Sequence, residues 1–328
     1  MADVPELMQN VCGTIGGNYM ITEMADDPIK RDYGVYNAYD HERPETPTQV
    51  LIASLDTPKW RWQASMSATQ TVLETVKGRS VHFPTLVKAA RVKRLVFGAD
   101  GVQDVENDPE YLRPVLVLQS PRCHSLLSTL AAYSPSGVLP VELAMFVGIG
   151  ITRALGALNR AGFIHRLVSP HSFSFVTPPT LDNLSTRLLI TDLSLAMPWP
   201  KRPRGAVPFV GTMRYSALSV HHSREQGPST DIISLIYVVA EMISGKLPWR
   251  SIMTQRLVKE AKTLFPSSKE FQRLPHEIRA LYKEMMETYP QAEVDYIAIQ
   301  EKFKAVLKRK DPNSTYELPP WLVQPCED

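Results

Sequence analysis

Histidine and cysteine are the side chains best suited to metal or redox chemistry, and their spacing in this sequence favours neither. The cysteines are odd in number and lack metal-ligand spacing: Cys12, Cys123 and Cys326. Four histidines likewise share no ligand spacing with cysteines or carboxylate clusters: His82, His124, His221 and His222. We therefore expect no metal site, and the cysteine pattern favours a reducing compartment.

The composition is that of a soluble globular protein, with 44% hydrophobic and 21% charged residues. The formal net charge is +2, from 36 basic and 34 acidic side chains, so a nucleic-acid partner is not expected. The N-terminus shows no secretory signal, and the apolar stretch from Leu143 to Ile151 is too short to span a bilayer. We expect a cytoplasmic and/or nuclear protein that does not bind membranes.

The elements that must position any site change in type near Ser120. Before it, short β-type runs alternate with polar, proline-containing segments; they cover residues 19–24, 34–39, 49–55, 94–97 and 115–118, with one helix predicted at 62–77. After it, apolar residues recur at spacings of three and four. The helices predicted there begin near Pro140 or cover 231–243, 251–264, 275–288 and 296–308.

These patterns predict an α+β protein with a small β-rich lobe and a larger helical lobe. The predicted divisions are an N-terminal extension at 1–14, an N-lobe at 15–119, a C-lobe at 120–310 and a tail at 311–328. The tail holds four prolines in 18 residues, which is typical of an extended segment.

Four segments between Gly162 and Trp249 follow one another in an order typical of one enzyme family. They are GFIHRLVSPHSF, LLITDLSLA, PRGAVPFVGTMRYSALSVHHSREQG and TDIISLIYVVAEMISGKLPWRSI. The first resembles GFIHRDxKPxNF, the catalytic loop of protein kinases of the casein kinase 1 superfamily. The other three resemble that superfamily's metal-binding segment, activation segment and central helix. The chain looks most like the tau-tubulin kinase branch, and the resemblance implies a bilobal protein kinase fold.

The resemblance also implies where reacting groups should stand, and most of these positions are altered. An active kinase orients the acceptor hydroxyl with a catalytic-loop aspartate and holds magnesium with an asparagine and a second aspartate. Here Leu167 replaces the catalytic aspartate, Ser169 a nearby lysine and Ser172 the asparagine. Asp192 survives at the second aspartate position. We expect no catalytic residue and no metal or cofactor site, with Asp192 as a remnant.

The phosphate and adenine positions of the N-lobe are altered too. The phosphate-pairing lysine falls at Ser54, its helical glutamate at about Thr69, and the glycine-rich loop keeps only Gly34. Three aspartates in that loop would repel phosphate: Asp26, Asp27 and Asp32. If Leu118 is the gatekeeper, the amide that normally donates to adenine falls at Pro121, which has no N–H. Binding of ATP with magnesium is therefore not expected.

The residues that match the family are mostly architectural, by resemblance: His165, Arg166, Tyr215 and Asp231. Asp231 lies in an apolar helix and needs hydrogen-bond partners, which the catalytic-loop backbone should supply. Basic residues near the activation segment hold an anion in the family and could form a phosphopeptide or acidic-motif pocket here: Arg214, Lys201, Arg202, Arg204, Lys246 and Arg250. The alternative is that these residues are solvated surface charge.

The leading prediction is a catalytically inactive pseudokinase that acts in signalling as a protein-binding or scaffold module. Its partner would be a protein, with an acidic or phosphorylated segment. The alternative is a weak or atypical serine/threonine protein kinase with residual nucleotide binding, using Asp192 for the metal and Lys30 or Arg31 for phosphate.

Overall fold

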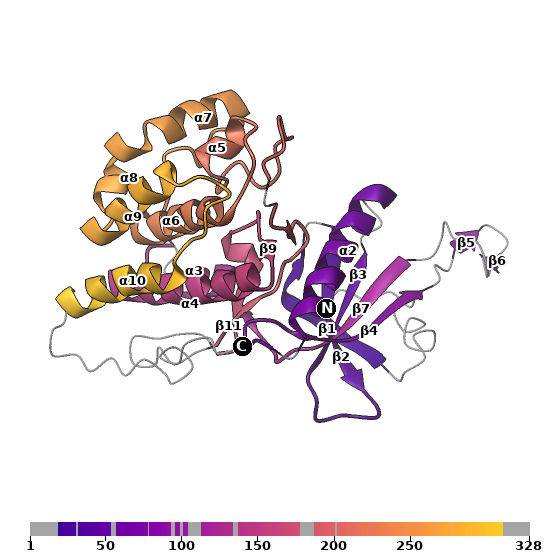
Figure 1. Cartoon of the computed structure of the whole chain (residues 1–328). Coiled ribbons are helices and arrows are strands. Elements are labelled where there is room, and N and C mark those ends of the chain that lie inside the picture. The colour runs from indigo at the N-terminus through magenta and orange to yellow at the C-terminus, as the bar shows by residue number, and fades with distance from the viewer. Residues whose placement is uncertain are drawn as a thin grey trace.

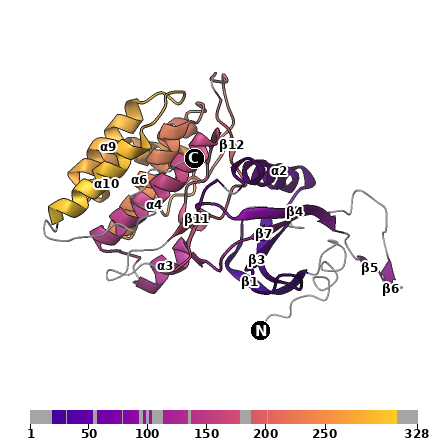
Figure 2. The same cartoon turned by 60° about the horizontal axis from the view of Figure 1, so that its bottom comes forward.

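The computed structural model describes residues 19–30, 32–53, 57–77, 79–92, 96–98, 101–103, 113–133, 137–177, 187–200 and 202–310. These residues form a β-rich small lobe followed by a larger helical lobe (Figures 1 and 2). The α+β bilobal fold predicted from the sequence is confirmed. The predicted extension at 1–14 and tail at 311–328 lie outside the described residues.

The small lobe is built on a five-stranded antiparallel sheet with strand order β1-β2-β3-β7-β4. Its strands are β1 (Tyr19–Ile29), β2 (Tyr33–Asp40), β3 (Thr48–Ala53), β4 (Thr85–Val92) and β7 (Arg113–Gln119). Because neighbouring residues of a strand point to opposite faces, Leu51 and Leu116 join the main core, whereas Val50 and Val117 join a second apolar cluster. A separate hairpin pairs β5 (Val96–Gly98) with β6 (Gly101–Gln103).

Helix α2 (Lys59–Val76) packs on this sheet. Trp62, Met66, Val72 and Leu73 recur at helical spacing and are buried, which fixes the face that α2 turns to the lobe. Figure 1 shows α2 on the side of the sheet toward the large lobe, and Figure 2 shows it lying along one face of the sheet. The helix therefore contributes side chains to both the sheet and the space between the lobes.

The large lobe is centred on α4 (Val141–Arg160) and α6 (Pro228–Ser244), which contact each other and are buried over most of their lengths. The other helices are α3 (Leu126–Tyr133), α5 (Leu218–His221), α7 (Gln255–Thr263), α8 (Lys269–Gln272), α9 (His276–Glu287) and α10 (Tyr296–Lys310). Helix α10 crosses α4 closely at Gly148, where an added Cβ would lie 2.4 Å from the Phe303 ring. Glycine at this position therefore permits the close contact.

Short elements connect the lobes and shape the large-lobe surface that faces the sheet. Two short sheets pair β8 (His124–Ser125), β10 (Phe173–Phe175) and β11 (Leu188–Ile190), and β9 (Phe163–Ile164) with β12 (Met197–Pro198). Two 3-10 turns occur at Pro170–Ser172 and Phe265–Ser267. Among the described helices, α4 is long and apolar enough to cross a membrane, but 89% of its apolar window is buried inside the protein, as in a core helix.

Several element boundaries differ from the sequence predictions. The run predicted at 94–97 corresponds only to β5, which begins at Val96, whereas the longer β4 was not predicted. Lys88, Ala89 and Ala90, whose residue types are depleted in strands, give β4 a weak strand pattern. Helix α3 was also not predicted. The helix predicted at 251–264 begins later, at Gln255, because Ser251–Thr254 form a turn and a helix cap before it.

Candidate functional site

The HRL loop, residues 165–172, is fixed by hydrogen bonds from its backbone to the carboxylate of Asp231 in α6. Asp231 accepts hydrogen bonds from the backbone N–H groups of His165 (2.7 Å) and Arg166 (2.9 Å). Burial raises the pKa of Asp231 to about 6, against the lowering effect of these two donors. Arg166 adopts a positive φ of 62° and donates from Nε to the carbonyl of Leu195 at 2.8 Å. Asp231 thus fixes the backbone on which catalytic side chains would stand.

The serine side chains of the HRL loop form hydrogen bonds within the loop itself. Leu167 is buried and has no atom that can accept a proton. The hydroxyls of Ser169 and Ser172 lie 3.1 Å apart, and Ser172 also donates to the carbonyl of Leu167 at 2.5 Å. Both serines are buried. The three substituted positions therefore form a closed, self-bonded turn.

His165 is the imidazole of this loop, and it is buried and neutral. Its Nδ1 accepts a hydrogen bond from the Leu167 backbone N–H at 3.1 Å, and its ring stacks on Phe173 at a centroid distance of 5.6 Å. Burial lowers the pKa of His165 to about 4. The geometry assigns His165 a packing and backbone-supporting role.

Asp192 lies next to a tyrosine that sequence reasoning missed. The hydroxyl of Tyr33, from β2, donates to Asp192 Oδ1 at 3.3 Å, and the same oxygen accepts from the Ser194 backbone N–H at 3.0 Å. Thr69, the position assigned by resemblance to the helical glutamate, is buried in α2, and its hydroxyl donates to the Ser65 carbonyl at 2.9 Å. Burial, then the charge of Asp192, raises the pKa of Tyr33, so the phenol stays protonated.

Tyr33 therefore brings a buried phenol from the small lobe to the Asp192 carboxylate. It is only 1% exposed and pairs in the sheet with Ala53, the residue before Ser54. Ser54 itself lies outside the described residues, as does Arg31. On the strand next to β3, the Tyr33 phenol is thus the described small-lobe group that bonds to Asp192.

The segment from Asp26 to Asp32, which comprises the end of β1 and the turn into β2, is tied to both lobes by its charged side chains. Lys30 is buried; its Nζ donates to the carbonyl of His171 in the HRL loop at 2.7 Å and pairs with Asp27 at 3.2 Å. Asp27 also contacts His171 Nδ1 at 3.0 Å. Burial opposes ionisation of Asp27, but the hydrogen bond from His171 and the charge of Lys30 outweigh it and lower the Asp27 pKa.

Two further aspartates of the same segment anchor it at other points. Asp26 accepts hydrogen bonds from the Ser125 backbone N–H and the Ser128 hydroxyl, both at 2.6 Å. Asp32 is buried, accepts from the Ser65 hydroxyl and pairs with Arg61 Nε at 2.6 Å. The three aspartates predicted to repel phosphate are therefore each bonded inside the protein, and they hold the hairpin against α2, α3 and the HRL loop.

The linker between the lobes also satisfies its own polar groups. The Ser120 backbone N–H donates to the carbonyl of Pro47 at 3.0 Å, and Pro121 has no N–H to offer. The Pro121 carbonyl accepts from the Cys123 thiol at 3.1 Å and the Ser120 hydroxyl at 3.3 Å. Burial raises the pKa of Cys123 to about 11, so the thiol keeps its proton. This linker resembles a kinase hinge whose adenine-binding groups are missing or engaged.

The basic residues predicted to form one anion pocket lie at two ends of α6. Arg204 binds Glu225, before the start of α6, through two guanidinium nitrogens at 2.6 and 2.7 Å. The hydrogen bond from Arg204 lowers the pKa of Glu225 to about 2. Arg214 lies 4.0 Å from Glu241, and Arg250 donates to the Gly245 carbonyl, both near the end of α6.

Thirteen residues of helix separate Pro228 from Glu241, a rise of about 20 Å. The structure therefore does not bring Arg204 and Arg214 into one pocket. Arg202 and Lys246 are exposed, and Lys201 lies outside the described residues. Tyr215 shares the carboxylate of Glu241, to which its hydroxyl donates at 2.5 Å. Both arginines thus face carboxylates of this chain.

A buried lysine that sequence reasoning missed anchors the activation-segment region. The Nζ of Lys262 in α7 donates to the carbonyls of Met213 (2.7 Å) and Ser216 (2.5 Å) and lies 3.1 Å from His221 Nε2. It also lies over the rings of Tyr237 and Trp249. Burial holds the pKa of Lys262 well below its ordinary value. A lysine in an amphipathic helix gives no sequence signal of such burial.

Within the ranges that the structure describes, no group of three or more His, Cys, Asp or Glu residues could hold a metal ion. His82 is buried; its Nδ1 lies 3.0 Å from the Leu188 carbonyl. His221 contacts Lys262, its neighbour His222 is exposed, and His124 is an exposed residue of β8. These histidines lie in different parts of the fold and do not converge.

Comparison with known proteins identifies kinase relatives at modest identity. A putative casein kinase I of Caenorhabditis elegans is 26% identical over 195 residues, which cover 56% of this chain and 56% of that protein. A probable serine/threonine-protein kinase of Dictyostelium discoideum is 25% identical over 177 residues, covering 53% of this chain and 36% of the relative. An inactive tau-tubulin kinase of C. elegans is 32% identical over 128 residues, covering 35% and 44%.

No family model matches the chain. The matched regions span roughly a third to a half of the first relatives' lengths. Casein kinase 1-like and tau-tubulin kinase-like proteins, together with the bilobal fold, support a kinase-like family for this chain. The site combines a kinase-like loop architecture with substituted reacting groups.

Proposed function

We propose that this protein is a pseudokinase of the casein kinase 1 superfamily, in the tau-tubulin kinase branch, and that it acts as a protein-binding or scaffold module. The observation that carries the proposal is that contacts between the two lobes close the space between them, which we call the cleft. Leu167 stands at the position of the catalytic base, and Tyr33 and Lys30 bond to Asp192 and the HRL loop from the opposite lobe. A nucleotide would have to break these contacts to enter.

The energetic argument concerns what ATP would gain in exchange. The glycine-loop phosphate contacts, the pairing lysine and the asparagine ligand supply most of a kinase's hold on Mg-ATP. Here the corresponding positions are a self-bonded hairpin, a tyrosine and a serine that donates within its own loop. Opening the cleft would cost the buried hydrogen bonds without restoring those ligands. The retained kinase-like fold then provides surfaces that bind a protein partner. We propose that it does so in the cytoplasm and/or nucleus.

Thermal unfolding of the purified chain with and without millimolar Mg-ATP tests this proposal. A ligand at a hundred times its Kd stabilises a protein by about 2.7 kcal/mol, which is a clear shift in midpoint. We expect no shift and no phosphate transfer to dephosphorylated casein. An active casein kinase 1 in the same buffer serves as the assay control. A shift accompanied by transfer that Asp192→Ala abolishes would overturn the proposal.

A weak or atypical serine/threonine kinase is the second candidate, favoured by the retained Asp192 and by relatives named as probable kinases. It would need Lys30 to leave Asp27 and the His171 carbonyl in order to meet phosphate. Lys30→Met separates the two candidates. The second candidate predicts loss of nucleotide binding in this variant, whereas the first predicts only a modest loss of stability.

A further inference from the structure

A groove lies on the small lobe, on a side of α2 that does not face the cleft. It encloses about 800 Å³ and is lined by one face of α2 from Lys59 to Gln70, by residues 89–91 of β4 and by Pro114 and Leu116 of β7. Ser65 of α2, whose hydroxyl donates to Asp32 of the cleft-side hairpin, is not among the lining residues. The groove is therefore separate from the site described above.

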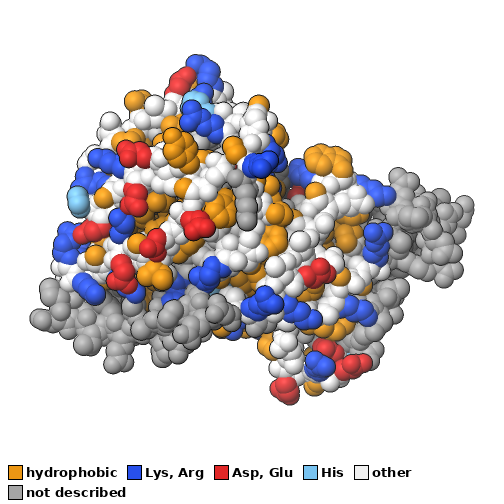
Figure 3. Space-filling view, in the orientation of Figure 1, with side chains coloured by type: hydrophobic (Ala, Val, Ile, Leu, Met, Phe, Trp, Pro, Cys, Tyr) orange, Lys and Arg blue, Asp and Glu red, His pale blue; other side chains and the backbone are white. Residues whose placement is uncertain are grey.

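The groove has an apolar floor and a polar rim. Its floor includes Trp62, Met66 and Leu116, which are buried members of the main core. The lining positions of α2 recur at helical spacing, so the rim follows a single face of the helix. Figure 3 shows apolar side chains on this part of the small lobe, with Lys and Arg side chains along its outer border. This composition suits an amphipathic ligand rather than a purely charged one.

The charge on the groove is entirely positive. Lys59 and Arg91 line it, and no aspartate or glutamate does. Both side chains are exposed, and neither forms an ion pair with any residue in the described ranges. By contrast, Arg61 on the same helix pairs with Asp32 at 2.6 Å. Among the described residues, these two cations have no partner carboxylate, and their positive potential complements an acidic ligand.

Strand β4 gives the groove a backbone edge. It is the terminal strand of the sheet, and no other described strand pairs with its outer side. Three consecutive residues, Ala89, Ala90 and Arg91, line the groove, whereas a single face of a strand would contribute alternate residues. An exposed strand edge offers N–H and C=O groups to an extended peptide. Ala89, which pairs with Leu116 on the α2 face, leaves room for the peptide's side chains, whereas the Ala90 side chain packs against the second apolar cluster.

An exposed aromatic ring borders the same groove. Trp60 is 71% exposed and precedes the lining residue Ser67 by seven positions, which places the two on the same side of α2. Tryptophan at a rim supplies a large rigid contact area at low entropic cost, and it is enriched among residues that dominate binding energy. The ring extends the apolar contact beyond the floor of the groove.

We propose that this groove binds an extended segment of a protein partner in which acidic residues flank a large apolar side chain. The apolar side chain packs over Met66 and Trp62, the acidic residues face Lys59 and Arg91, and the backbone of the segment lies along β4. This inference rests on the proposed binding-module function and names its surface and the chemistry of its partner.

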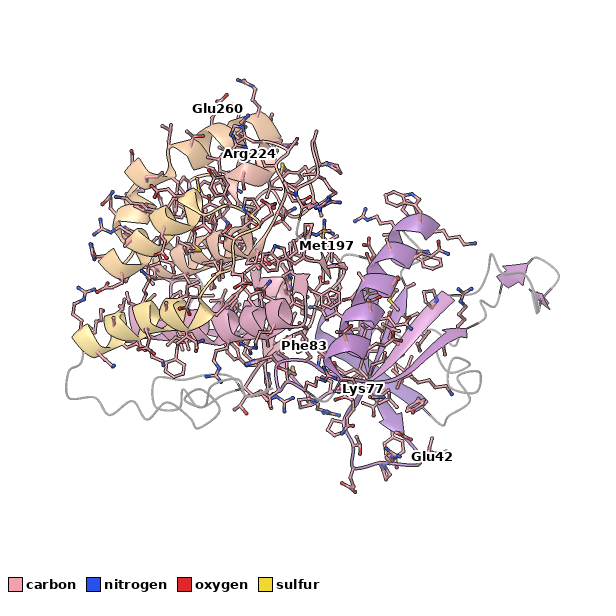
Figure 4. All side chains as sticks on the ribbon, viewed as in Figure 1. Glu42, Lys77, Phe83, Met197, Arg224 and Glu260 are labelled. Atoms are coloured by element: carbon pink, nitrogen blue, oxygen red, sulfur yellow. The ribbon has the colours of Figure 1, made fainter. Side chains whose placement is uncertain are left out.

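A synthetic peptide in which glutamate alternates with phenylalanine, labelled with fluorescein, tests the proposal by fluorescence anisotropy on the full chain. One control peptide carries lysine in place of glutamate, and another carries serine in place of phenylalanine. The groove variant is Lys59→Glu with Arg91→Glu. The matched control is Lys77→Glu with Arg79→Glu, which makes the same charge change at exposed positions beyond the lined stretch of α2 (Figure 4 labels Lys77).

We expect saturable binding of the glutamate peptide, weakened about tenfold or more by the groove variant and less than about twofold by the control variant. Both control peptides should bind more weakly. A neutral variant, Ser67→Trp, should fill the groove and weaken binding without any charge change, so the test does not depend on the folding of the double variant. Unfolding midpoints close to that of the wild type establish that each variant is folded.

Absence of saturable binding, equal weakening by both charge-reversal variants, or equal affinity for the lysine peptide would overturn the groove proposal. The Mg-ATP measurements on the same proteins are independent of this result. Phosphate transfer together with intact peptide binding would overturn the pseudokinase proposal alone. Absence of saturable peptide binding to the wild-type chain, with no stabilisation by Mg-ATP, would overturn the groove proposal alone.

Discussion

Buried polar contacts hold two regions on either side of the cleft, and they do so in different ways. In the large lobe, Asp231 satisfies backbone N–H groups of the HRL loop from within the same lobe. In the small lobe, Tyr33 and Lys30 reach across the cleft to groups of the other lobe. The first region preserves the architecture of a kinase site, and the second occupies its space. Substitution of the residues at the reacting positions and retention of the surrounding fold are therefore separable.

The largest expected loss of stability comes from a substitution in the large lobe. Asp231→Ala leaves two backbone N–H groups without their buried acceptor, and we expect a loss of about 3–5 kcal/mol in the free energy of unfolding. Chemical denaturation measures it. Asp295→Ala is the matched control, because Asp295 also accepts two backbone N–H groups, at the exposed start of α10, and should cost about 1 kcal/mol. Equal losses in the free energy of unfolding for the two variants would show that burial of the Asp231 carboxylate does not increase its contribution.

The pH dependence of stability sharpens the comparison, because one buried histidine, His165, belongs to the HRL loop and another, His82, lies outside it, just before β4. Burial lowers the pKa of both His165 and His82 to about 4. The unfolded chain therefore binds these protons at higher pH than the folded chain, so stability falls as the pH drops from about 6.5 to about 4. Each histidine contributes a slope of up to about 1.4 kcal/mol per pH unit.

Asp231 acts in the opposite direction, since its pKa of about 6 in the folded state lies above its ordinary value. Its contribution stabilises the folded state as the pH falls through that value. His82→Gln should remove one histidine's share of the slope, as measured by denaturation at a series of pH values. An unchanged slope in this variant would mean that His82 takes up protons equally in the folded and unfolded chain.

The smallest expected effect lies in the cleft. Tyr33→Phe removes the hydroxyl that donates to Asp192 but keeps the ring, so we expect a loss of about 1 kcal/mol in the free energy of unfolding. The control is Tyr39→Phe, at a partly exposed position, with a loss near zero. A loss as large as that of Asp231→Ala would indicate that the cleft contacts also hold the architecture.

The sequence best predicted those parts of the molecule whose residues belong to motifs in the same order as in the casein kinase 1 superfamily. The position of Leu167 and the contact between Asp231 and the loop backbone both follow from motif spacing. The role of Tyr33 could not be predicted in this way, because its partner Asp192 is 159 residues distant and the contact depends on how the lobes close. Lys30 meets His171 across 141 residues for the same reason.

Local composition accounts for the other differences. Strand β4 contains lysine, alanine and arginine, which have weak strand propensity, so its pairing with β7 decides its structure. The six basic residues were grouped by their position around one segment, but Glu225 and Glu241 bind two of them at opposite ends of α6. A charge pattern alone does not reveal which carboxylates the fold brings close.

The burial of Lys262 has a chemical consequence. An amine with a lowered pKa is more often unprotonated at neutral pH and is then a better nucleophile than an ordinary lysine. Its full burial against the carbonyls of Met213 and Ser216 is what keeps acylating reagents away. Acylation of Lys262 would therefore mark molecules in which the activation-segment region has opened, and its labelling rate would report how often that opening occurs.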